Sequence, residues 1–126
     1  MEISEYQQLT EDTAVYPKEI GLFYTMLGFI GETGELAEKI KKVIRDDIDW
    51  DIHSNLDAQS VTHLIIQEIH NHPDYDIEDE LGDIFYYFMR VCEELECDSG
   101  AIAERNIEKL HDRMERDVIH GSGDYR

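Results

Sequence analysis

The chain has 126 residues and a formal net charge of −19, and 41% of its residues are hydrophobic. This length suits one domain with a core of its own, and the hydrophobic content excludes a disordered acidic tail. Only 11 lysines and arginines accompany 30 aspartates and glutamates. Because a nucleic-acid polymer or an anionic membrane requires a basic face on its partner, we expect neither as a partner.

No apolar run approaches the roughly 20 residues that a membrane span needs. The N-terminal stretch MEISEYQQLTED is acidic and lacks the apolar segment of a signal peptide, so we expect a cytoplasmic protein. The two cysteines, Cys92 and Cys97, are five residues apart and point in different directions on a helix. We therefore predict neither a disulfide nor a zinc site.

The hydrophobic pattern predicts helices throughout the chain and no pair of alternating strands. Pro73 ends one helix, and Asp98 or Ser99 has the character of an N-cap. The stretch DDIDWDIHSN, residues 46–55, interrupts the helical pattern. The predicted helices cover residues 4–15, 18–45, 57–72, 76–96 and 100–119. We expect an all-α fold, a compact bundle of four to five helices in one domain over residues 1–126.

The long second helix contains the unusual stretch GFIGETGELAEKIKK, residues 28–42. Glycine costs about 1 kcal/mol relative to alanine in a helix interior, and Glu32 and Glu35, three residues apart, repel each other. Such costs are tolerated where something outside the helix offsets them, as a cation between these two carboxylates would. The alternative is a solvated face with a Glu35–Lys39 pair. Gly28 would let another helix or a ligand approach closely.

The apolar residues of this helix spread over far more than the ~100° stripe of a surface helix. We therefore expect burial on more than one side, and in a chain of this size we expect the second partner to be another subunit.

A second acidic pair, Glu80 and Asp83, lies in the stretch EDELGDIFYY with Tyr87 one turn further on. If the two helices pack antiparallel, the four carboxylates can converge, and they would repel strongly without a cation. Carboxylate oxygens suit Mg²⁺, Mn²⁺ or Ca²⁺. We favour Mg²⁺, because it is usually bound together with phosphates.

The last predicted helix carries Asn106, Lys109 and Arg113 on one stripe. These side chains can contact phosphate oxygens, Arg113 in bidentate fashion and Lys109 as a point charge. The alternative is surface pairing with neighbouring acids, namely Glu108, Asp112 or Asp117.

The three stretches GETGELAEKIKK, EDELGDIFYYF and ERNIEKLHDR, taken in order, resemble the all-α nucleoside triphosphate pyrophosphohydrolases of the MazG type. The pattern of that family is E-x-x-E, then E-x-x-D, then N-x-x-K-x-x-x-R, and the C-terminal HGSGDYR is also similar to the ends of some small members. The resemblance covers about residues 20–126.

The resemblance implies hydrolysis of an NTP or dNTP to the monophosphate and pyrophosphate, in nucleotide pool control or house-cleaning. It implies Mg²⁺, with Mn²⁺ as a possible substitute, held by four carboxylates, and a homodimer or homotetramer. Tyr87 and Asn106 would bind the nucleotide. Glu35 would also accept a proton from the attacking water, and Lys109 and Arg113 would bind and stabilise the phosphates. The implied metal ligands are Glu32, Glu35, Glu80 and Asp83.

One departure from compact members is the connection of 44 residues between Glu35 and Glu80. It contains an insert at about 46–76, which could cover the site, contribute to the base pocket or extend a subunit interface. Its four histidines could form a metal site, and the alternative is that they are solvated or capping residues. They are His53, His63, His70 and His72.

Two alternative functions would also use acidic residues on helices. A di-iron carboxylate bundle needs two Glu-x-x-His pairs, and the chain has one, Glu108 with His111. The other is a catalytically idle acidic helical module that binds a protein or nucleotide partner.

Overall fold

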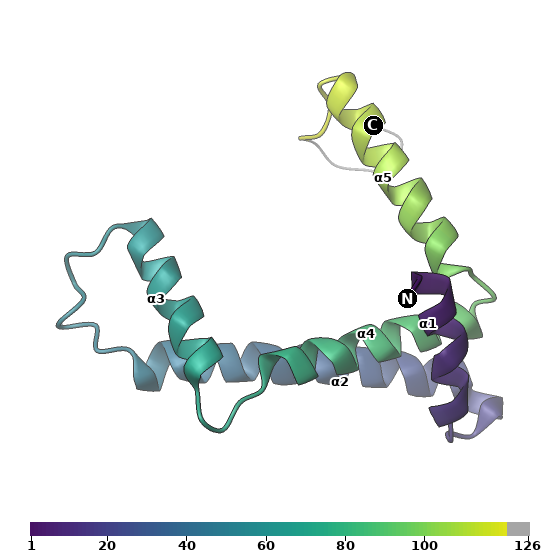
Figure 1. Cartoon of the computed structure of the whole chain (residues 1–126), viewed down its shortest axis with the longest axis horizontal. Helices are drawn as coiled ribbons and strands as arrows, with labels where there is room; N and C mark the ends of the chain where they lie inside the picture. Colours follow the sequence, from purple (N-terminus) through teal and green to yellow (C-terminus); the bar gives the residue numbers. More distant parts are fainter. Residues whose placement is uncertain (121–126) are drawn as a thin grey trace. The chain divides into compact units, whose positions relative to one another are not determined.

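The structure is a computed structural model that describes residues 1–120, so the predicted tail HGSGDYR lies, except for its first residue, outside the described residues. Within this range the chain forms five α-helices and no strand, which confirms the all-α prediction (Figure 1). The helices are α1 (Ile3–Leu9), α2 (Gly21–Lys42), α3 (Ala58–Asn71), α4 (Ile77–Glu94) and α5 (Ser99–Glu115). Two 3-10 turns, η1 (Thr10–Thr13) and η2 (Lys18–Ile20), lie between α1 and α2, and a π-helical turn, η3 (Val43–Asp47), continues α2.

Aspartate caps begin α3 and α5. The Asp57 carboxylate accepts a hydrogen bond from the Ser60 N–H at 2.9 Å, and that of Asp98 accepts one from Ala101 at 2.7 Å. Each cap satisfies an N–H group that has no partner inside the helix. The predicted start of the last helix at Asp98 or Ser99 is thus confirmed.

The ends of α4 and α5 share a motif that the sequence pattern did not indicate. Glu96 and Asp117 adopt φ angles of 53° and 54°. The Cys97 N–H then binds the Cys92 carbonyl at 2.8 Å, and the Val118 N–H binds the Arg113 carbonyl at 2.9 Å. This left-handed cap usually contains glycine. Without that signal the last helix was predicted to reach residue 119, but it ends at Glu115.

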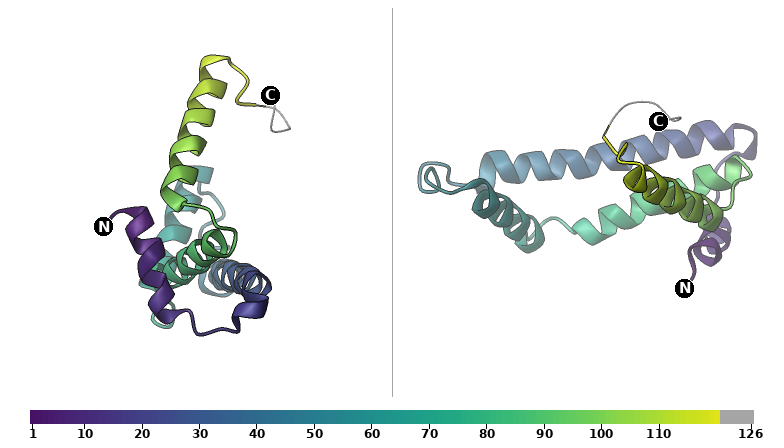
Figure 2. Two further views of the ribbon diagram at one scale, coloured as in Figure 1. Left: turned by 90° about the vertical axis from the view of Figure 1, so that its right-hand side faces the viewer. Right: turned by 90° about the horizontal axis from the view of Figure 1, so that it is seen from above.

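The contacts group the chain into two compact units. The first consists of Met1–Leu22 and the chain from Met89 onward. In it α1 lies beside the start of α5 (Figure 2). The buried amide of Gln7 joins the two, because it accepts from the Ser99 N–H at 2.8 Å and donates to the Cys97 carbonyl at 2.9 Å.

Arg90, at the end of α4, holds the N-terminal segment of this unit through a buried polar network. Its guanidinium is 1% exposed and donates to the Tyr16 hydroxyl at 3.1 Å and the Glu11 carboxylate at 2.6 Å. The Tyr16 hydroxyl donates in turn to Glu94 at 2.6 Å. Burial and this bond to Glu94 raise the pKa of Tyr16 to about 12. Tyr16 therefore stays a neutral donor at physiological pH.

The second unit, Phe23–Phe88, contains most of α2, all of α3 and the first part of α4. Near one end of the α2–α4 pair, Gly28 of α2 faces the Tyr87 ring of α4. Near the other end, Lys39 of α2 binds Glu80 of α4. These pairs show that α2 and α4 run antiparallel, side by side (Figures 1 and 2). α3 packs against η3, and the Trp50 indole donates to the Ile44 carbonyl at 2.8 Å.

Candidate active site

The antiparallel pairing of α2 and α4 brings carboxylates from both helices together. Oxygens of Glu32, Glu35 and Glu80 all lie within 4.8 Å of one another. Glu32 and Glu35 share an edge of α2 because residues three apart are neighbours on a helix. Asp83, the fourth predicted ligand, is exposed and does not belong to this group of three. Its charge nevertheless acts on Glu32.

The electrostatics of this group favour a bound cation. The pKa of Glu32 is raised, first by burial and then by the charges of Asp83 and Glu35 and, after them, of Glu80. The Oε2 atom of Glu80 is buried and has no hydrogen-bond partner among the described residues. An unpaired buried acceptor costs about 1–3 kcal/mol. A hard divalent ion among these oxygens would remove that cost and the mutual repulsion, so the residues fit such an ion.

Lys39 does not pair simply with Glu35 on its own helix, which was the alternative interpretation of the sequence. Its ammonium binds Oε1 of Glu80 on α4 instead of forming the simple Glu35–Lys39 pair. It also lies 5.8 Å from the ring centroid of Tyr75. Sequence spacing could not indicate this contact, because Glu80 lies on another helix, 41 residues further along the chain.

Tyr87 lies beside the carboxylates. Its ring packs on Gly28 so closely that a Cβ atom at that position would overlap the ring, which explains the small residue there. The pKa of Tyr87 is raised by burial, by the charge and hydrogen bond of Tyr24 and by the charge of Glu32. Tyr24 was not predicted as a site residue. Tyr24 lies four residues before Gly28 and eight before Glu32, a spacing that places all three on one face of α2 and could have indicated its role.

The predicted phosphate-binding residues lie on α5, in the first unit. Asn106 and Lys109 are exposed and line a hollow of about 320 Å³, whereas Arg113 is buried. Asp112, one of the alternative partners, instead forms a bidentate pair with Arg116, whose Nη2 donates to Oδ2 at 2.6 Å and whose Nε donates to Oδ1 at 3.1 Å. The carboxylates belong to the second unit, so the convergence of the three α5 residues with them stays a prediction.

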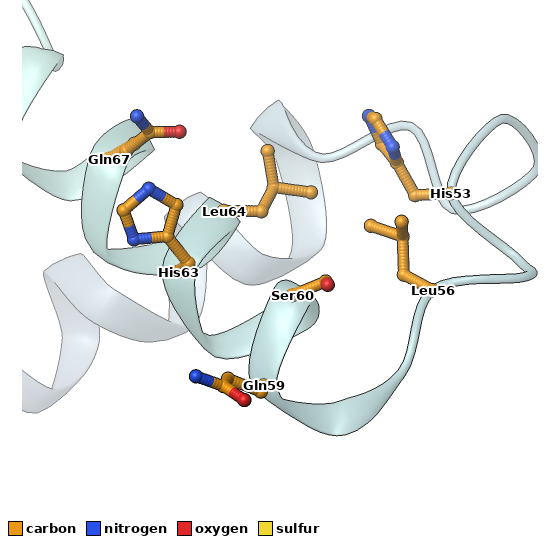
Figure 3. A pocket seen from close by; sticks show the side chains of 7 residues that line it. All are labelled: His53, Leu56, Gln59, Ser60, His63, Leu64 and Gln67. Carbon is orange, nitrogen blue, oxygen red and sulfur yellow. The ribbon is translucent and has the colours of Figure 1, made fainter.

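The insert contains a separate hollow of about 430 Å³. Figure 3 shows Leu64 pointing from α3 towards the loop that carries His53 and Leu56. None of the predicted site residues lines this hollow, and the three proposed roles of the insert stay predictions. The residues around it are His53, Leu56, Gln59, Ser60, His63, Leu64 and Gln67.

The other two histidines of the insert make local contacts. His72 stacks on Tyr75 with ring centroids 3.7 Å apart, and its Nε2 lies 3.5 Å from the Asp47 carboxylate. Nδ1 of His70 is 2.9 Å from the Ile66 carbonyl. Among residues 1–120, no histidine belongs to a group of potential metal ligands. Cys92 and Cys97 are both free thiols, and Cys92 is buried.

Comparisons with known proteins agree with the motifs. The model of the family described as "MazG nucleotide pyrophosphohydrolase domain" matches residues 24–117, a range that contains every predicted site residue. The "Gene 37 protein" of Mycobacterium phage L5 is 34% identical over 132 residues, and the match covers all of both chains. No solved structure matches. None of the helices in the described range is long and apolar enough to span a membrane. The chain therefore belongs to the family of MazG nucleotide pyrophosphohydrolase domains.

Proposed function

We propose that this protein hydrolyses a nucleoside or deoxynucleoside triphosphate to the monophosphate and pyrophosphate. Family membership supports nucleotide pyrophosphohydrolase activity. The single observation that carries the proposal is the group of Glu32, Glu35 and Glu80 around a buried, unpartnered oxygen of Glu80. We also propose a role in nucleotide pool control or house-cleaning, and a location in the cytoplasm, where these nucleotides are found.

We further propose Mg²⁺ as the cofactor, held by Glu32, Glu35, Glu80 and Asp83, with Mn²⁺ as a substitute. When bound, the ion supplies charge neutralisation for the triphosphate and makes a bound water more acidic. This also accounts for the binding of an anionic substrate to a chain with a net charge of −19.

The reaction needs a base and a set of cations from the chain itself. A water oxygen attacks the α-phosphorus, the α–β anhydride bond breaks, and pyrophosphate leaves. We assign the water proton to the Glu35 carboxylate. Lys109 and Arg113 would stabilise the charge that builds up on the phosphates, and Asn106 and Tyr87 would hold the nucleotide. Because these groups lie in both units, we propose that residues 1–126 act as one domain.

The test is pyrophosphate release from the eight common NTPs and dNTPs, with Mg²⁺ and with EDTA. We expect release from at least one nucleotide in Mg²⁺ only, and its loss in Glu80→Ala. Glu78→Ala is the matched control, since Glu78 is exposed on the same turn of α4. A catalytically idle module would instead show no release from any nucleotide and no heat of metal binding.

An apolar stripe on α2 supports a homodimer or homotetramer. Phe23, Leu27 and Ile30, at i, i+4 and i+7, are 75%, 71% and 60% exposed. Such a contiguous apolar stripe is typical of a protein–protein contact, and we propose that a second copy of the chain covers it.

A charge in this stripe should separate the subunits. We expect Leu27→Glu to sediment as a monomer under conditions in which the wild type is an oligomer, because an unpaired carboxylate would be buried in the contact. Ile52→Glu, at a position in the insert that is 73% exposed, is the control and should leave the oligomer intact. A wild type that sediments as a monomer at every concentration would contradict the proposal.

A further inference from the structure

The ammonium group of Lys39 binds one of the carboxylates of the candidate metal centre. Lys39 follows Glu35 by one helical turn, and its ammonium binds Oε1 of Glu80 across the two helices. The side chains of Lys39 and Glu80 are 25% and 12% exposed. Since both are largely shielded from water, their attraction is screened less than that of a surface pair.

A chain of contacts connects this ammonium to both ends of the insert. The Tyr75 ring lies next to the Lys39 ammonium and stacks on His72 at an interplanar angle of 9°. His72 in turn contacts Asp47. Asp47 lies near the start of the insert, and His72 and Tyr75 lie near its end. The insert therefore closes on itself at the position that presents an aromatic ring to Lys39.

The two oxygens of Glu80 have different environments. Oε1 is bound to Lys39, whereas Oε2 is buried and unpartnered in the described part of the chain. A carboxylate whose charge is compensated by an ammonium attracts a divalent ion less, and the two cations repel each other at short range. Lys39 and a metal ion are thus competitors for Glu80.

We propose that Lys39 is a resident counter-ion that controls metal loading. It neutralises Glu80 while no divalent ion is bound, and it leaves Glu80 when the ion binds, with the Tyr75 ring offering the ammonium a place beside the site. This inference rests on the metal centre in the proposed function. It adds that the chain lowers its own affinity for the metal, so that loading depends on a displacement.

The test uses Mn²⁺ alone, added to the full nucleotide-free chain, with the free ion followed by its EPR signal. We expect Lys39→Met to bind Mn²⁺ about tenfold more tightly than the wild type, because the competing charge is gone. Lys39→Arg, which keeps the charge, should stay near the wild type. Lys41→Met is the matched control, since Lys41 pairs with Glu38 on the surface of the same helix and its loss changes the net charge equally.

Thermal unfolding provides a second test of the Lys39 proposal that does not depend on enzymatic activity. Lys39→Met should melt at a lower temperature than the wild type in EDTA, and the difference should disappear in saturating Mn²⁺, because the Lys39–Glu80 contact is then absent from both proteins. The inference would be wrong if Lys39→Met bound Mn²⁺ no more tightly than the wild type, or if it lowered Tm equally with and without metal. Neither result would contradict the proposed metal centre. A wild type and a Lys39→Met variant that both fail to bind Mn²⁺ would overturn the metal centre and the inference with it.

Discussion

Replacing Glu35 by glutamine is expected to lower pyrophosphate release at least ~100-fold, the lower range for the loss of a general base. Of the three grouped carboxylates, Glu35 is the exposed one, whereas Glu32 and Glu80 are partly buried. An exposed carboxylate beside the phosphates can accept a proton from a water molecule. Glutamine keeps the size and most of the hydrogen bonding but cannot take the proton.

Because Glu35 is also a proposed metal ligand, turnover and Mn²⁺ affinity are to be measured on the same preparation. A general base predicts a loss of turnover that remains at saturating metal, whereas a ligand alone predicts recovery. Glu38→Gln is the matched control, one turn further along α2, where Glu38 pairs with Lys41 and Lys42. Near-normal turnover of Glu35→Gln would remove Glu35 from the site.

The second large effect is on stability. We expect Arg90→Met to lower the free energy of unfolding by about 3 kcal/mol, because hydrogen bonds to a charged group contribute about 1.5–3 kcal/mol. Arg90, Thr10 and Tyr16 are all buried, so water cannot replace the hydrogen bonds of Arg90 to Thr10 and Tyr16. Its third partner, the Glu11 carboxylate, is 54% exposed and keeps its contact with Lys18. The N-terminal segment would then lose its attachment to the end of α4.

Urea unfolding, followed by circular dichroism, measures this loss. Arg116→Met provides the comparison, because Arg116 forms a bidentate pair with Asp112 but is 50% exposed. Surface pairs of this kind contribute about 0–1 kcal/mol. If both variants lose the same small amount, the Arg90 network does not hold the N-terminal segment in place.

Local sequence signals located most of the helices. The predicted ranges 18–45, 57–72 and 76–96 correspond to α2 with η3, α3 and α4, because apolar periodicity and aspartate caps act within one or two helical turns. The errors lie at helix ends. Asp117 takes a left-handed conformation that glycine would have signalled, and the first helix turns into 3-10 geometry at Thr10.

The sequence by itself determined the all-α class, the family and the two acid-x-x-acid pairs, since each depends on spacing within a helix. The antiparallel contact of α2 with α4 decided which carboxylates meet. It also decided that Lys39 binds Glu80 and that Tyr87 packs on Gly28. Likewise the fold placed Arg90 among Thr10, Glu11 and Tyr16. Such partners lie 41 to 80 residues apart in the chain, so no local periodicity could indicate them.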